Sequence, residues 1–72
     1  MPNFIINSEP QPRGEHEVHN FDALCSHLPK MENRIDLGYH YSCHEAIAYA
    51  RKRWPDSQID GCYYCCRECH TR

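Results

Sequence analysis

The chain has 72 residues, a net charge of −2 at pH 7 with histidine neutral, six cysteines and six histidines. This length predicts a single small domain over residues 1–72. So short a chain buries little apolar surface, and it therefore often needs a disulfide, a metal or a partner for stability. The near-neutral charge excludes the strongly basic composition of a dedicated nucleic-acid-binding protein.

The first residues, MPNFIINSEPQPRGE, lack the pattern of a secretory signal, because the apolar run ends at Ile6 instead of continuing for about 7–15 residues. No stretch of the chain approaches the roughly 20 apolar residues of a membrane-spanning helix. We therefore expect a cytoplasmic protein. In a reducing compartment, clustered cysteines are more often metal ligands than disulfides, although disulfides and free redox thiols remain alternatives.

Short strands are predicted in the N-terminal half. Residues 3–7 are β-prone, and the prolines and glycine of the following SEPQPRG predict a loop, so residues 1–14 are partly loop-like. Residues 15–21 form a weaker second strand. Over residues 35–41 isoleucine, leucine and two tyrosines alternate with other residues, which is typical of a strand with one buried face.

Residues 43–54 are predicted to form one amphipathic helix. Ser42 and Glu45 fit a capping box at its start, and Pro55 ends it. One helical face is apolar, at Cys43, Ile47, Ala50 and Trp54. Cys43 is therefore expected to be a core residue rather than a ligand. Together these elements predict an α+β fold with a two- or three-stranded antiparallel sheet, one helix and a C-terminal zinc knuckle.

The expected knuckle lies in the C-terminal sequence DGCYYCCRECHTR. Cys62 and Cys65 have the C-x-x-C spacing with which two thiolates hold one tetrahedral ion. A structural zinc takes four ligands, so two more must come from elsewhere. One option is local and uses Cys66, Cys69 or His70.

The other option is a distant pair, Cys25 and His19, which follows the second predicted strand. This pair ties the start of the domain to its end, so that zinc binding stabilises the whole fold. We select Cys62, Cys65, Cys25 and His19 as the ligands of one structural Zn²⁺, and keep Cys69 and His70 as reserve ligands.

The order of these elements resembles the metal-binding N-terminal domain of the Ada alkylation-repair family. The resemblance covers VHNFDALC, then IDLGYHYSCHEAIAYARKRWP, then DGCYYC. It implies one zinc ion, with Cys62 and Cys65 as the closing ligand pair and Cys25 in the opening pair. His19 stands in for the second opening cysteine, and CRECH is not part of the Ada plan. The likeness implies a fold and a metal, not alkyl transfer.

We expect no enzyme and assign no catalytic residue, because no G-x-S-x-G, H-E-x-x-H or glycine-rich phosphate loop occurs. The expected function is a binding module that recognises a protein partner. Nucleic acid is a weaker candidate, favoured only by the basic run at residues 51–53. The alternative is a thiol- or metal-handling protein that uses the CxxCCxxCH tail for redox or metal exchange.

Overall fold

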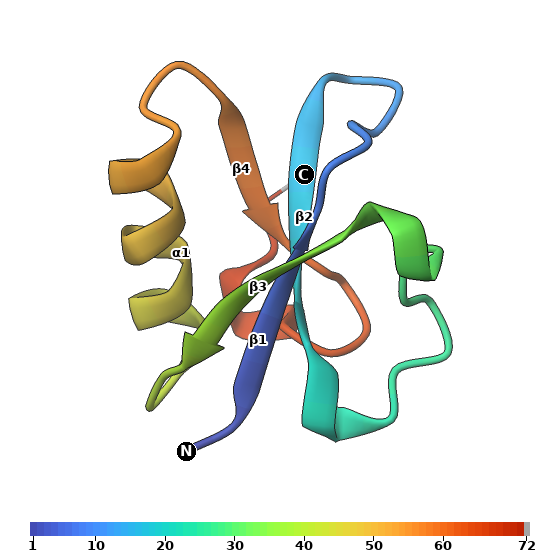
Figure 1. The fold of residues 1–72 in the computed structure, drawn as a ribbon, viewed down its shortest axis with the longest axis vertical. Helices are drawn as coiled ribbons and strands as arrows, with labels where there is room; N and C mark the ends of the chain where they lie inside the picture. Colours follow the sequence, from blue (N-terminus) through green and yellow to red (C-terminus); the bar gives the residue numbers. More distant parts are fainter. Residues whose placement is uncertain (72) are drawn as a thin grey trace.

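The computed structural model describes residues 1–71, which form a four-stranded mixed sheet and one α-helix (Figure 1). In the order β3-β1-β2-β4, β1 pairs antiparallel with β2 and β3, whereas β4 runs parallel to β2. The elements are β1 (Asn3–Asn7), β2 (Glu15–Asn20), β3 (Arg34–Tyr39), α1 (Cys43–Arg53) and β4 (Gln58–Gly61). No helix within residues 1–71 has the length and apolar content needed to cross a membrane.

The prediction of an α+β fold with one helix is confirmed for the described residues. The prediction of a two- or three-stranded antiparallel sheet is wrong, because it misses β4. This strand has only four residues, too few to show an alternating pattern. Its parallel pairing with β2 depends on α1, which forms the crossover between β3 and β4.

The start of α1 follows the expected capping. Ser42 Oγ accepts a hydrogen bond from the Glu45 backbone N–H at 3.3 Å. The Glu45 carboxylate accepts from the backbone N–H of Tyr41 at 3.1 Å, one residue earlier than in a standard capping box. The helix ends at Arg53, one residue before the predicted end. Its buried residues are Cys43, Ala46, Ile47 and Ala50.

The two faces of the sheet have different roles. One face packs against α1 and forms the hydrophobic core with Phe4, Ile6, Val18, Leu37 and Ile59. Since side chains alternate along a strand, Ile5 and His19 lie on the opposite face. These two residues are paired across β1 and β2, and both are buried. His19 is therefore separated from the helix side of the core by the sheet itself.

The predicted burial of tyrosines along residues 35–41 is wrong for Tyr39 and Tyr41, which are 66% and 79% exposed. The register between β1 and β3 shifts at Phe4/Ile5, where β3 contains an extra residue. Gly38 has a φ of +84°, a conformation that other residues rarely adopt. Such a bulge reverses the alternation of side chains along β3, so the side chain of Tyr39 at the strand end points away from the core.

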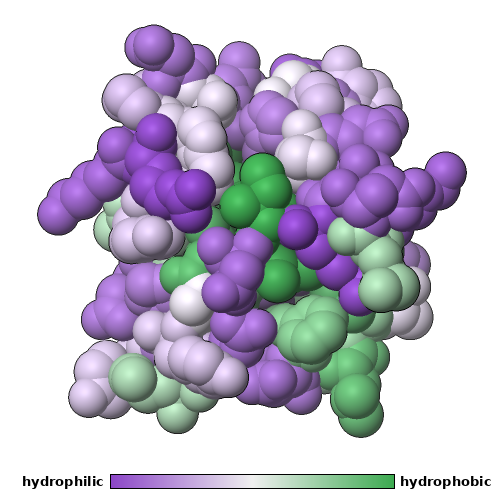
Figure 2. Space-filling model, viewed as in Figure 1, coloured by the Kyte–Doolittle hydropathy of each residue, from purple (hydrophilic) through white to green (hydrophobic). Residues whose placement is uncertain are grey.

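The helix leaves part of the core accessible. Figure 2 shows hydrophobic residues at the centre of one face and toward its lower right edge, with hydrophilic residues over much of the rest. A hollow of about 110 Å³ lies between the sheet and the end of α1, where Ile6, Ile35, Trp54 and Ile59 line it. Its volume is below the roughly 300–1,000 Å³ of pockets that bind drug-sized ligands.

Candidate metal centre

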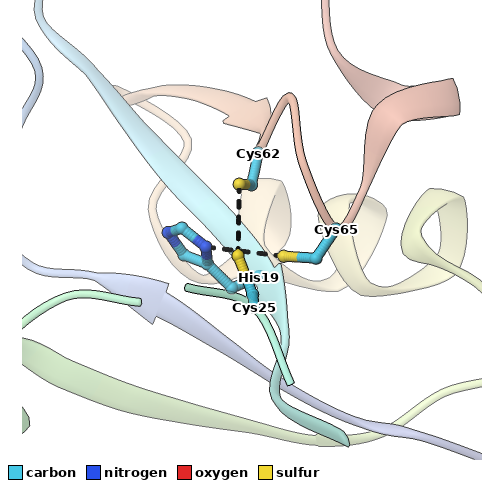
Figure 3. A group of neighbouring side chains, drawn as sticks. All are labelled: His19, Cys25, Cys62 and Cys65. Atoms are coloured by element: carbon cyan, nitrogen blue, oxygen red, sulfur yellow. Dashed lines mark hydrogen bonds between the residues drawn. The ribbon is translucent and has the colours of Figure 1, made fainter. Parts of the chain in front are cut away.

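Four potential metal ligands converge from three separate segments (Figure 3). His19 lies in β2, Cys25 lies in the loop after a short 3-10 turn (Phe21–Ala23), and Cys62 directly follows β4. Cys65 comes three residues later. Their ligand atoms all lie within 4.8 Å of one another. The structure thus brings together the four residues that were selected from the sequence.

Two distances between these atoms match those between the ligands of a tetrahedral zinc ion. The Sγ atoms of Cys25 and Cys62 are 3.8 Å apart, and Cys65 Sγ is 3.6 Å from His19 Nδ1. Zn–S bonds of about 2.3 Å and a Zn–N bond of about 2.05 Å at tetrahedral angles require separations of roughly 3.8 Å and 3.6 Å. The donor set therefore fits a four-coordinate ion.

Backbone N–H groups point at two of the sulfur atoms. The N–H of His27 donates to Cys25 Sγ, and the N–H of Tyr64 donates to Cys62 Sγ, both at 3.4 Å. Hydrogen bonds of this kind stabilise a thiolate more than a thiol. Both loops are thus arranged to hold deprotonated cysteine, the form that binds metal.

Backbone contacts fix the position of the knuckle. The N–H of Cys62 donates to the Val18 carbonyl at 2.9 Å, and the N–H of Cys66 donates to the Cys62 carbonyl at 2.9 Å. A Cβ atom on Gly61 would lie 2.8 Å from both the Cys66 carbonyl oxygen and Cys69 Cβ. Only glycine therefore fits here, and the close approach holds Cys62 beside β2.

The protonation of the four residues reflects their burial. Burial, followed by the charges of nearby groups, lowers the pKa of His19 to about 4, so its imidazole is neutral and can bind metal. Burial raises the pKa of Cys25, and that of Cys62 to about 12. The pKa of Cys65 is raised first by its hydrogen bond with Cys66 and then by burial. A bound cation would supply the positive charge that these thiolates need.

Glu17 is a partner of the site that the sequence reading missed. It precedes His19 by two residues on β2, so both side chains lie on the same face. Glu17 Oε1 is 3.8 Å from His19 Nε2, the ring nitrogen that faces away from the sulfur atoms, and it accepts from Gln11 Nε2 at 3.4 Å. The contact is longer than a hydrogen bond, but a carboxylate on this side of the ring would orient a metal-binding histidine if it closed to hydrogen-bonding distance. The sequence signal for Glu17 is its spacing of two residues from His19 in a predicted strand, which places both side chains on one face.

We expect Glu17→Ala to weaken zinc binding by about 10- to 100-fold, because the His19 ring loses the group that orients it. Competition with a chromophoric chelator measures this change. Glu17→Gln retains a hydrogen-bond acceptor and should lose less affinity, whereas the exposed Glu32→Ala should behave like the wild type. Equal affinities for all four proteins would show that Glu17 does not support the site.

The reserve ligands lie outside the four-residue group. Cys69 forms a disulfide with Cys43, and His70 Nδ1 donates to the Gly61 carbonyl at 3.0 Å. Cys66 is a free, fully buried thiol in the hydrophobic core. Cys43 is buried, as expected of a core residue, but the disulfide was not anticipated for this residue. The two cysteines are separated by 26 positions in sequence, and no sequence signal indicates their pairing.

Comparison of the chain with protein-family models, with curated proteins and with solved structures finds no match. The class of protein is therefore defined by the fold and the site alone. It is a small cysteine-rich α+β domain with a candidate metal site formed by three cysteines and one histidine.

Proposed function

We propose that this protein is a small binding module whose fold is stabilised by a structural Zn²⁺ ion at His19, Cys25, Cys62 and Cys65. The convergence of these four donors from three segments carries the proposal. Three sulfurs and one nitrogen are a donor set typical of structural zinc, which takes four protein ligands and leaves no position for substrate. The proposed role is therefore recognition of a partner and not catalysis.

We also propose that the order of the ligands along the chain resembles that of the Ada metal-binding domain. Cys62 and Cys65 supply the closing pair, and Cys25 and His19 supply the opening pair. The proposal does not extend to alkyl transfer, since His19 replaces the second opening cysteine and CRECH is not part of the Ada plan.

The proposed binding surface surrounds the knuckle and consists of His27, Tyr63, Tyr64 and Arg67. The rings of His27 and Tyr64 stack with centroids 3.7 Å apart, and Tyr63 meets Tyr64 edge to face at 5.1 Å. The guanidinium of Arg67 lies 5.0 Å from the centre of the Tyr63 ring. Tyr63 and Tyr64 are nevertheless 45% and 63% exposed. These contacts order the rings beforehand, which lowers the entropy lost on binding.

A protein partner suits this knuckle surface better than a nucleic acid. Tyrosine and arginine are enriched among the residues that contribute most to protein–protein binding. A cleft of about 320 Å³ beside the two tyrosines is also lined by Gln11, Glu17 and His27. A carboxylate in the cleft and a net charge of −2 disfavour a phosphate backbone, which requires a basic groove.

Selection of random displayed peptides against the zinc-loaded protein tests this proposal. We expect an enriched peptide motif whose affinity falls at least tenfold in Tyr64→Ala. Tyr41→Ala, which removes an exposed tyrosine outside the knuckle surface, should change it less than twofold. Absence of any motif would overturn the proposal. Salt-sensitive binding of a single-stranded oligonucleotide that is lost in Tyr64→Ala would also overturn it, in favour of nucleic acid.

A further inference from the structure

A second group of metal-binding side chains lies where the start of α1 meets the C-terminal segment. It consists of Cys43, His44 and Cys69, whose ligand atoms also lie within 4.8 Å of one another. The two cysteines form a disulfide in the structure, with their Cα atoms 6.4 Å apart. His44 is exposed, whereas both cysteines are buried.

We infer that Cys43, His44 and Cys69 form a second Zn²⁺ site in the reduced protein, and that the disulfide is the oxidised, metal-free form of this site. This inference goes beyond the structural zinc proposed above and does not depend on the same ligands. It assigns a role to Cys69, which lies in the part of the CxxCCxxCH tail that the first site does not use.

The position of Cys43 favours a thiolate. It is the first residue of α1, an 11-residue helix, and the positive end of the helix dipole stabilises negative charge there. Cys69 belongs to the 3-10 turn Arg67–Cys69, so the two sulfurs come from separate elements. The sulfur atoms of a zinc dithiolate lie about 3.8 Å apart, and rotation of the two side chains can produce this separation once the disulfide is reduced.

The third ligand is accessible from solvent. His44 follows Cys43 in the first turn of α1, and its exposed ring brings a nitrogen within 4.8 Å of both sulfur atoms. Three protein ligands leave the fourth position to water, an arrangement that structural zinc sites lack. Zinc at this site would therefore exchange more readily than zinc held by four ligands.

The two forms of the site are related by a balanced reaction. Two equivalents of a low-molecular-weight thiol reduce the Cys43–Cys69 disulfide to two thiols, and the reductant leaves as its own disulfide. Zn²⁺ then replaces the two thiol protons and binds the neutral imidazole of His44, so two protons are released. Cys25, Cys62 and Cys65 are thiols in the same structure. A thiolate reductant opens a disulfide by attack on one sulfur through a mixed disulfide.

The zinc content of the whole protein tests this inference. The protein is loaded with Zn²⁺ under anaerobic conditions, with or without prior reduction of the disulfide, and zinc per chain is measured by elemental mass analysis. We expect two equivalents in the reduced form and one in the disulfide form. A chelator should remove the second equivalent first. One equivalent in both forms would overturn the inference.

Three variants identify the ligands. His44→Ala changes an exposed side chain, so it should fold normally and bind the second zinc at least tenfold more weakly. Cys69→Ser should lose the second zinc entirely. Glu32→Ala changes an exposed side chain outside both groups and should keep both ions. Unchanged binding in His44→Ala would overturn the inference.

The same measurement separates the two proposed sites. If the reduced protein holds one zinc that is lost in Cys62→Ser but kept in Cys69→Ser, the second site is wrong and the structural zinc stands. If that one zinc is lost in Cys69→Ser but kept in Cys62→Ser, the structural zinc is wrong and the site at the start of α1 stands.

Discussion

Cys62→Ser is expected to lose its structural zinc and to unfold at far lower denaturant concentration than the wild type. Structural zinc contributes about 10–16 kcal/mol in small zinc-finger domains, so one of four ligands accounts for roughly 2.5–4 kcal/mol. This corresponds to a loss of zinc affinity of several hundredfold, on the order of 2.5 powers of ten. A domain of this size is stable by only about 5–15 kcal/mol, so the loss is a large part of its total stability.

Elemental analysis of the disulfide form and denaturant unfolding followed by circular dichroism measure the two effects. Ile47→Val is the control, because it trims a buried side chain that is outside the ligand group. The control should keep one zinc and lose only about 0.5–1.5 kcal/mol of stability. A Cys62→Ser protein with one zinc and the wild-type unfolding curve would contradict the assignment.

Zinc binding to the disulfide form is expected to strengthen about 1,000-fold for each unit of pH between roughly 6 and 8. The pKa values of Cys25, Cys62 and Cys65 are all raised in the metal-free fold, so each enters the site as a thiol and releases one proton on binding. His19, with its pKa lowered to about 4, is already neutral and releases none. Acid therefore weakens zinc binding, and the logarithm of the affinity should change by three for each unit of pH.

Competition with a chelator of known protonation at several pH values gives this slope. Calorimetry in buffers of different ionisation enthalpy counts the released protons independently. His44→Ala in its disulfide form is a suitable control, since the site at the start of α1 is then closed, and it should show the same slope. A slope of one or two would mean that fewer than three thiolates bind the ion.

The stability of the metal-free fold should fall in both acid and alkaline solution. The pKa of His19 is lower in the folded state than its usual 6.5, so stability is lost as pH falls from about 6.5 toward 4. The pKa of Cys62 is raised from 9.0 to about 12, so its contribution is complete below pH 9 and is lost as pH rises through that range. Unfolding of the zinc-free protein at several pH values measures both trends.

Local signals in the sequence determined the helix. Ser42 and Glu45 mark its start, and the repeat of apolar residues defines its buried face. Both depend on residues three or four positions apart, which contact one another as soon as a helix forms. The spacing of Cys62 and Cys65 is equally local, and by itself it indicates a metal site.

The remaining ligands were selected by the need for four donors, and only the tertiary structure decided how they meet. His19 reaches the site because β2 turns alternate residues to the face away from α1, and Cys62 is beside it because β4 pairs with β2. The disulfide of Cys43 and Cys69 and the outward turn of Tyr39 likewise depend on long-range contacts.

One physical cause separates the features that the local sequence determines from those that the tertiary structure decides. Helix caps and C-x-x-C turns are stabilised within a few residues, so their patterns can be read along the chain. Sheet register, a parallel edge strand and a disulfide join segments that are distant in sequence, and their energies depend on the packing of the whole core. The sequence therefore determined which residues could bind a metal, and the fold decided which of them share one ion.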